Sequence, residues 1–232
     1  MLAKLKQALL NLAKPERAIQ TACFFKTGEG QYGEGDIFIG ITNPEVRTLV
    51  KEFWKVITLA DIQILLADKI HEFRFTGLMI LVEQFQKANE EKRTEIVEFY
   101  LKNLPQINNW DLVDCSCYKI LGEFLLDKDR QVLYQLAESK HLWSERIAVV
   151  STMAFIRKSQ FLDCFRLSEF FLTHPHDLMH KACGWMLREI GKRDELALEE
   201  FLEENLTKMP RTMLRYAIEK MEDKKRLSYL KR

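Results

Sequence analysis

A charged residue followed by an apolar block, Arg146-Ile-Ala-Val-Val150, decides the fold, because the same pattern recurs along the chain. The equivalent charged positions are Arg74, Asp111, Lys181 and Arg215, and successive members are 37, 35, 35 and 34 residues apart. A period of this length predicts helical pairs that stack on their neighbours. We therefore expect an all-α protein, specifically an α-solenoid (superhelix) of HEAT-like helical repeats.

Helical apolar periodicity continues on both sides of this stretch, with only short breaks. It predicts helices over residues 43–54, 58–67, 71–88, 90–103, 108–126, 128–139, 142–157, 160–172, 175–191, 194–206 and 209–220. Residues 2–26 predict one or two more, broken near Pro15, and Thr42 is an N-cap candidate followed by Pro44 and Glu45. The 9 glycines and 5 prolines are too few for the turns of a β-sandwich.

The glycine-rich stretch Thr27–Asp36 holds four of those glycines and is expected to be a loop. It matches neither the GxxxxGK[ST] phosphate loop nor GxGxxG, so it gives little support for a nucleotide site, and we expect no cofactor. We expect one HEAT-like repeat domain over residues 1–232, with variant N-terminal helices and this loop within residues 1–36.

The charge balance excludes a protein that coats nucleic acid through bulk charge. The chain has 35 Lys plus Arg against 34 Asp plus Glu, a net charge of +1. Charge is nevertheless segregated, since residues 194–205 hold six acids and no base, whereas residues 207–232 hold nine bases and three acids. A polyanion site must therefore be a local basic patch.

The 5 cysteines have no disulfide-framework or zinc spacing, and no secretory leader pattern opens the chain. No apolar run approaches the ~20 residues of a membrane helix. We expect a cytoplasmic monomer without a metal site or membrane contact. His174, His176 and His180 lack the HExxH pattern, and a surface loop with a helix start explains them better than metal binding.

Four of the five repeat positions are cations, namely Arg74, Arg146, Lys181 and Arg215. Equivalent helices would place them on one curved face as a basic track. An alternative of equal weight is that each is only a solvated residue at a helix start.

The densest group of polar and aromatic residues is Asn108-Asn-Trp-Asp-Leu-Val-Asp114. On a helix, Trp110 and Asp114 share one face, and Asp111 lies near the helix start, where a carboxylate is favourable. Asp114 follows two apolar residues, where an ionised group is costly unless it is paired or functional. A salt bridge to a neighbouring arginine and a catalytic role are both consistent with this pattern.

Two further tryptophan motifs are Trp143-Ser-Glu-Arg146 and Gly184-Trp-Met-Leu-Arg-Glu189. We expect Trp143 in the core, whereas Trp185 fits either the core or the basic face. An indole and a carboxylate beside cations suit a substrate in which a cationic base is bonded to a sugar. The indole attracts a cationic base, and the carboxylate stabilises positive charge that develops on a sugar.

Together these motifs resemble the AlkD-like DNA alkylation repair glycosylases, HEAT-like proteins that remove alkylated purines from DNA. The resemblance rests on Phe38-Ile-Gly-Ile-Thr-Asn-Pro-Glu-Val-Arg47, Trp110-Asp-Leu-Val-Asp114, Trp143-Ser-Glu-Arg146 and Gly184-Trp-Met-Leu-Arg-Glu189, in the family's order and spacing. It extends from residue 37 to about residue 220.

The resemblance implies a DNA glycosylase that hydrolyses the N-glycosidic bond of cationic N3- or N7-alkylated purines in duplex DNA. It assigns catalysis to Asp114, lesion binding to Trp110 and Trp185, and a grip on the DNA backbone to Arg146. The cations expected on the basic face, Lys181, Arg188, Arg74 and Arg215, would hold further phosphates.

The N-terminus departs from the family pattern. The glycine-rich loop, Gly28–Asp36, stands where relatives carry a helix that helps to cradle the lesion. This difference and the near-neutral charge favour the alternative function, a non-catalytic HEAT-like module that binds DNA structure or a protein.

Overall fold

The computed structural model describes residues 1–231 and contains two compact units, Met1–Ser116 and Cys117–Arg232. The sequence pattern predicted a single repeat domain. Each pair in a helical repeat builds its core with neighbouring pairs, so one continuous sequence pattern is compatible with two separate cores. Each unit is described by itself.

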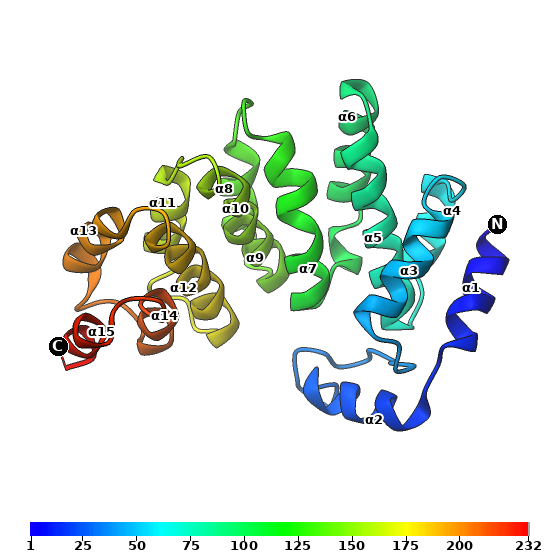
Figure 1. The fold of residues 1–232 in the computed structure, drawn as a ribbon, viewed down its shortest axis with the longest axis horizontal. Coiled ribbons are helices and arrows are strands. Elements are labelled where there is room, and N and C mark those ends of the chain that lie inside the picture. The colour runs from blue at the N-terminus through cyan, green and yellow to red at the C-terminus, as the bar shows by residue number, and fades with distance from the viewer. Residues whose placement is uncertain (232) are drawn as a thin grey trace. The chain divides into compact units, whose positions relative to one another are not determined.

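The first unit is built around α5, which packs against α3, α4 and α6, while α1 packs against α3. Its helices are α1 (Leu2–Asn11), α2 (Pro15–Phe24), α3 (Asn43–Phe53), α4 (Leu59–Leu66), α5 (His71–Lys87), α6 (Glu90–Lys102), the 3₁₀ helix η1 (Leu104–Gln106) and α7 (Trp110–Cys117), as Figure 1 shows.

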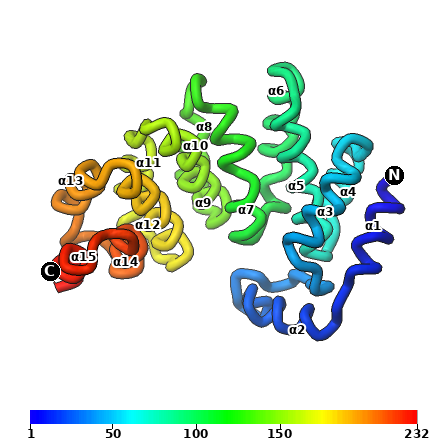
Figure 2. Tube along the Cα trace, in the orientation of Figure 1, coloured from blue at the N-terminus to red at the C-terminus, as the bar shows by residue number. Residues whose placement is uncertain are grey.

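In the second unit α12 is central and packs against α9, α11, α13 and α14. The elements are the π-helix η2 (Tyr118–Gly122), α8 (Gln131–Ala137), α9 (Leu142–Ser151), α10 (Met153–Ile156), α11 (Leu162–Phe170), α12 (Asp177–Gly191), α13 (Glu195–Asn205), α14 (Arg211–Ala217) and α15 (Asp223–Lys231), and Figure 2 traces their order.

The all-α helical repeat fold expected from the sequence is confirmed. Within residues 1–231 no strand forms, and the only β-type pairing is an isolated bridge between Ile37 and Ile70. The predicted helices correspond closely to the observed ones, including the break at Pro15. Membership of the HEAT-like class stays a prediction.

Two predicted helices are interrupted. The helix expected over residues 108–126 is α7 followed by η2, whose wider turn contains Gly122. A Cβ at Gly122 would lie 2.4 Å from the Ser151 carbonyl oxygen, so this glycine allows close backbone approach to the end of α9. The helix expected over residues 142–157 breaks at Thr152, whose hydroxyl donates to the Val149 carbonyl at 2.6 Å.

The first turn of α5 is unusual because it buries charge. The segment from His71 to Val82 is buried on all sides, and it begins with His71, Glu72 and Arg74 among apolar residues. Glu72 accepts hydrogen bonds from the backbone N–H groups of Ile39, Gly40 and Ile41 at 2.8–3.3 Å. Burial of these charges therefore requires the segment that precedes α3.

That segment leads into α3 through a helix cap that the sequence predicted. Glu45 accepts from the Thr42 backbone N–H at 2.7 Å and from its hydroxyl at 2.6 Å.

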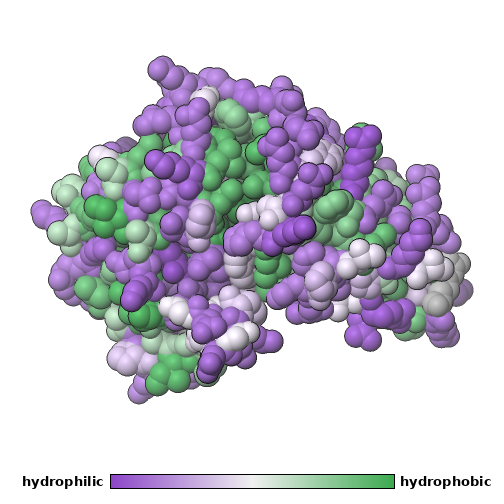
Figure 3. Space-filling model, turned by 180° about the vertical axis from the view of Figure 1, so that it is seen from behind, coloured by the Kyte–Doolittle hydropathy of each residue, from purple (hydrophilic) through white to green (hydrophobic). Residues whose placement is uncertain are grey.

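Polar residues cover most of the face drawn in Figure 3, where hydrophobic patches interrupt them. Exposed apolar side chains on α2 include Ile19 and Phe24.

Gly184→Ala is expected to destabilise the second unit by about 1–3 kcal/mol. A Cβ there would lie 2.5 Å from both the Met213 carbonyl oxygen and the Tyr216 Cβ, where α12 meets α14. This overlap outweighs the ~1 kcal/mol that alanine gains over glycine within a helix. Urea unfolding measures the change. Gly28→Ala is the control, since its added Cβ meets only the flexible Gln31 side chain; equal stability of both variants would contradict the packing account.

Candidate active site

The start of α7 carries the residues that the sequence singled out. The Asn109 side-chain oxygen accepts from the Trp110 backbone N–H at 2.8 Å, and Asp111 Oδ1 accepts from the Leu112 N–H at 2.8 Å. These bonds satisfy amide groups that a helix start leaves without partners. Asp111 therefore lies at the helix start, as predicted, while Asp114 follows one turn later and is partly exposed.

Trp110 and Asp114 line one cavity of about 560 Å³ in the first unit. Three chain segments meet there: α2 with its C-terminal end, the residues that lead into α3, and α7. The residues that matter for chemistry are Arg17, Thr21, Phe24, Phe25, Trp110 and Asp114. The structure therefore brings two of the motifs together, those that begin at Phe38 and at Trp110.

Stacked aromatic rings form one wall of this cavity. The Phe25 and Trp110 rings are nearly parallel, with centroids 5.0 Å apart and planes 9° apart. Phe38 stacks on the same Phe25 ring at 4.8 Å, and Phe24 meets Trp110 edge to face at 5.9 Å. Phe25 is buried, whereas Phe24 is 66% exposed. The wall therefore offers an accessible aromatic edge beside a carboxylate.

The N-terminal helix α2 belongs to the cavity wall. Arg17 donates from Nη1 to the Gly40 carbonyl at 3.1 Å and to Glu45 Oε2 at 3.0 Å, which ties α2 to the start of α3. Hydrogen bonds from Thr42 and the Arg17 cation lower the pKa of Glu45 to about 2. Gly40 has φ of +80°, and a Cβ there would lie 2.3 Å from the Lys14 carbonyl oxygen, so glycine permits this close contact.

This arrangement corrects the expectation for the N-terminus. The sequence placed the glycine-rich loop, Gly28–Asp36, where a helix cradles the lesion in relatives. In the structure α2 lines the cavity, and residues 28–36 are not among its lining residues. The pair Phe24-Phe25 just before the glycines is the sequence signal that would have located this wall.

Arg74 is not a surface cation. Its side chain is 8% exposed, and Nη2 lies 2.5 Å from Asp36 Oδ1 in a buried ion pair. The prediction that Arg74 holds DNA phosphates is therefore corrected, because its charge is already neutralised inside the first unit. His71 also binds Asp36 in this buried group of charges, and the sequence analysis did not identify it. The signal that could have found it is His71-Glu-Phe-Arg74, in which three titratable side chains directly precede an apolar run.

In the second unit the predicted site residues have unequal exposure. Trp143 is 6% exposed and belongs to the core, as predicted, and Trp185 is partly exposed on α12. Arg146 is only 5% exposed and donates to the Leu178 carbonyl at 2.5 Å, so it does not extend the basic track expected on the surface.

The remaining cations are more accessible. Lys181 pairs with Asp177 at 2.8 Å, Arg188 pairs with Glu219, and Arg215 is exposed on α14. Of the four repeat cations, Lys181 and Arg215 therefore remain for surface contacts.

The three clustered histidines adopt the expected loop and helix start. His174 Nε2 lies 3.1 Å from Glu145 Oε2, and His176 accepts from the Leu178 N–H at the start of α12. Among residues 1–231 no group of three or more His, Cys, Asp or Glu side chains is arranged to hold a metal ion. In the same range no helix has the length and apolar character needed to cross a membrane.

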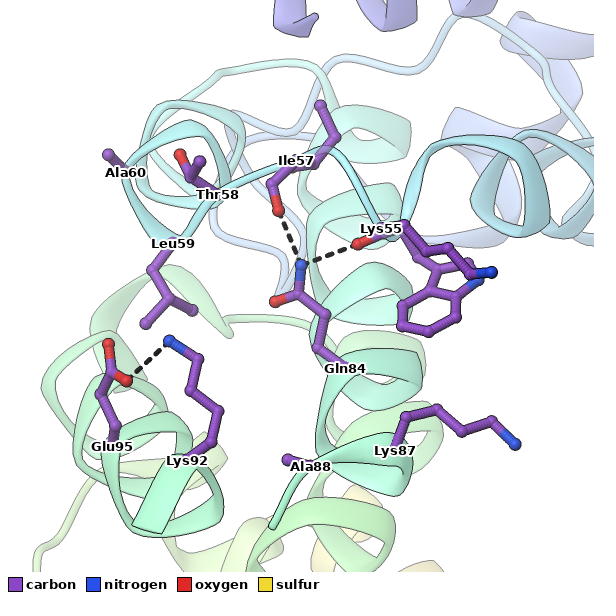
Figure 4. Close-up of a pocket in the computed structure, with 11 residues that line it drawn as sticks. Lys55, Ile57, Thr58, Leu59, Ala60, Gln84, Lys87, Ala88, Lys92 and Glu95 are labelled. Atoms are coloured by element: carbon purple, nitrogen blue, oxygen red, sulfur yellow. Dashed lines mark hydrogen bonds and ion pairs between the residues drawn. The ribbon is translucent and has the colours of Figure 1, made fainter.

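A second depression, of about 610 Å³, lies elsewhere in the first unit, and Figure 4 shows it in close-up. Gln84 donates its amide to the Trp54 and Ile57 carbonyls, and Lys92 pairs with Glu95 at 2.6 Å. These polar groups satisfy one another, and none of the lining residues belongs to the four motifs. The cavity at Trp110 is therefore the better candidate site.

Comparison with known proteins identifies the family. The sequence profile of the family described as "DNA alkylation repair enzyme" matches residues 5–221. No curated protein matches the chain. Among solved structures, the "Predicted DNA alkylation repair enzyme from Enterococcus faecalis" is similar, with a TM-score of 0.74 and 19% identity over 91% of this chain and 97% of that one. This likeness supports the fold, and the match to the profile shows that the chain belongs to the family of DNA alkylation repair enzymes.

Proposed function

We propose that the protein is a monofunctional DNA glycosylase, which hydrolyses the N-glycosidic bond of cationic N3- or N7-alkylated purines in duplex DNA. The observation that carries the proposal is the cavity in which Asp114 lies beside an aromatic wall. Family membership supports a role in DNA repair, and the chemistry of this cavity favours the substrate class. The proposal requires no metal or cofactor and takes the protein as a cytoplasmic monomer.

The aromatic wall suits a cationic base. A positive charge against an aromatic face gains ~0.5–2 kcal/mol by cation–π attraction, and a purine adds stacking area. Phe24 and Trp110 present aromatic surface to the cavity, whose volume of about 560 Å³ falls within the range of small-ligand sites. We assign lesion contact to these two rings, and to Trp185 by resemblance.

The carboxylate suits the bond that breaks. An alkylated purine already carries positive charge, so the electron pair of the C1′–N bond neutralises it as the base departs, and no general acid is needed. Positive charge then develops on the sugar, where an ionised Asp114 would stabilise it until water adds at C1′ and releases its proton. One carboxylate therefore suffices, in contrast to the two carboxylates of ordinary glycosidases.

Contacts to the DNA backbone are assigned to cations of the second unit. Lys181, Arg188 and Arg215 are at least partly exposed and are proposed to contact phosphates. The resemblance also implied a backbone contact for Arg146, but this side chain is buried and donates to the Leu178 carbonyl, so we do not assign it one. A few such contacts agree with a chain of net charge +1, which predicts modest nonspecific affinity.

The alternative function is a non-catalytic module that binds DNA structure or a protein. The reasons for it are the changed N-terminus and the near-neutral charge, and the presence of α2 in the cavity wall weakens the first of them. The decisive experiment incubates the protein with methylated duplex DNA and measures free 7-methylguanine and 3-methyladenine. Salt-dependent binding without release would favour the alternative, and absence of salt-sensitive binding would point to a protein partner.

Asp114→Asn is expected to slow single-turnover release of 7-methylguanine by about 100-fold or more, because the amide cannot stabilise a cationic sugar. Affinity for the duplex should change little. Glu98→Gln removes an exposed carboxylate from α6 and serves as the control. Unchanged excision by folded Asp114→Asn would contradict the catalytic assignment.

Phe24→Ala is expected to raise the half-saturating concentration for alkylated duplex by about 5- to 150-fold, the equivalent of ~1–3 kcal/mol of stacking with one base. Ile19→Ala is the matched control, since Ile19 is 69% exposed on the same helix but does not line the cavity. Equal saturation curves for the two variants would show that Phe24 does not meet the lesion.

Arg215→Ala is expected to weaken binding to all duplex sequences alike and to reduce the slope of log K against log salt concentration by about 1. Lys102→Ala, an exposed cation at the end of α6, should leave this slope unchanged. The slopes follow from fluorescence anisotropy between 50 and 200 mM salt, roughly the interval over which phosphate contacts lose most affinity. If the slope for Arg215→Ala equals that of the unaltered protein, Arg215 does not contact a DNA phosphate.

A further inference from the structure

The first unit contains a buried histidine that bridges two carboxylates. His71 is 2% exposed at the start of α5; its Nδ1 lies 3.0 Å from Asp36 Oδ2, and its Nε2 lies 2.8 Å from Asp111 Oδ2. An ionised carboxylate only accepts hydrogen bonds, so both ring nitrogens must donate. With both carboxylates ionised, the ring is therefore an imidazolium.

The charges around this ring balance. The ionised groups that face it are Asp36 from the end of the glycine-rich loop, Asp111 from α7 and Arg74 from α5. Arg74 binds the second oxygen of Asp36, so two anions and two cations lie together away from water. Loss of the proton from His71 would leave one buried negative charge in excess, which is costly.

The surroundings favour the charged ring at neutral pH. Burial alone opposes the charge, but the Asp111 and Asp36 carboxylates outweigh it and raise the pKa of His71 to about 9. Burial likewise opposes ionisation of Asp36, yet hydrogen bonds from His71, Arg74 and Asn109 hold the pKa of this carboxyl below its ordinary value of 3.8.

The bridge is connected to the backbone on both sides of Trp110. Asp111 accepts a hydrogen bond from His71 Nε2–H at one oxygen and from the Leu112 N–H at the other. Asn109 donates to Asp36 Oδ2 at 3.0 Å and accepts from the Trp110 N–H. The bridge thus fixes both residues that flank Trp110 along the chain.

The histidine ring also supports the aromatic wall. Its centroid lies 4.4 Å from that of Phe38 and 5.2 Å from that of Phe25, the ring on which Trp110 stacks. The first turn of α7 is therefore hydrogen-bonded to His71 through Asp111, and the Trp110 ring is connected to the His71 ring through Phe25, which contacts both. Asp114 follows in the same helix, so movement of this turn displaces the carboxylate as well.

We propose that His71 is a positioning residue: as an imidazolium bound to Asp36 and Asp111, it fixes the first turn of α7 and thereby the placement of Trp110 and Asp114 in the cavity. The inference rests on the proposed excision site for its functional consequence. That the His71 bridge positions Trp110 is a separate structural claim. The structural claim and the proposed excision activity can therefore fail independently.

The experiment follows the His71 ring nitrogens and the Trp110 indole N–H by NMR from pH 6 to 10.5, together with single-turnover release of 7-methylguanine. In the unaltered protein we expect His71 to titrate near pH 9, the Trp110 resonance to shift with the same midpoint, and excision to fall at least 10-fold through it. The loss of activity at high pH is expected because the pKa of His71 in the folded protein lies above its ordinary value of 6.5. The charged bridge therefore contributes its full stabilisation below about pH 6.5 and loses it as pH rises through about 9.

Variants separate positioning from simple folding. His71→Gln should lower the maximal excision rate about 10- to 100-fold through displacement of Asp114. It should also raise the half-saturating concentration, because Trp110 is displaced with it, and the Trp110 shift near pH 9 should vanish. His71→Gln/Asp111→Asn removes one charge of each sign, and it should recover part of the lost rate with a flat profile to pH 10. His141→Gln, at the exposed start of α9, should behave like the unaltered protein.

Each outcome decides one claim. A Trp110 resonance that does not change while His71 titrates, or excision by folded His71→Gln at the unaltered rate, overturns the positioning role. If the unaltered protein releases no base but Trp110 still follows His71, the proposed function fails and the bridge stands. The titration of the unaltered protein gives this answer even if His71→Gln does not fold.

Discussion

A shared imidazolium between two buried carboxylates is the interaction on which the first unit depends. Residues 71–82 of α5 are buried on all sides, yet the helix begins with His71, Glu72 and Arg74. Such a helix start is tolerable only where every charge has a partner. The segment from Asp36 to Ile41 supplies these partners, because Asp36 binds His71 and Arg74 while three backbone N–H groups bind Glu72. The loop, α5 and α7 are therefore held by one set of polar contacts.

The same contacts explain why a carboxylate and aromatic rings meet in one cavity. The ordered segment after the glycines anchors α2 through Gly40 and Arg17, which brings Phe24 to the cavity edge. The bridge at His71 orients α7, which brings Trp110 and Asp114 to the same cavity. An accessible π surface and one carboxylate match a substrate whose base is already cationic, because departure of that base needs no added proton. Near-neutral total charge is then no obstacle, since the site needs local complementarity and few phosphate contacts.

Much of the fold could be predicted from the sequence, because apolar periodicity and helix caps are local signals. The break at Pro15 and the cap at Thr42 depend on residues within one or two turns of helix, and the period of about 35 residues is the length of one helical pair. Within the candidate site, the spacing of four residues placed Trp110 and Asp114 on one helix face, and their roles came from the family resemblance alone. Arg74 was misassigned, since a repeat position does not reveal that Asp36, 38 residues earlier, neutralises it. Phe24 and His71 were missed because their partners lie on other chain segments, where no spacing rule connects them.

Mass spectrometry of a duplex that carries a single 7-methylguanine tests the central claim most directly. After incubation with the protein, the account predicts a strand in which an abasic sugar with a hydroxyl group at C1′ replaces the nucleotide, together with free 7-methylguanine. A strand of unchanged mass, in a complex with correctly folded protein, would contradict the claim that the cavity of Trp110 and Asp114 excises alkylated purines.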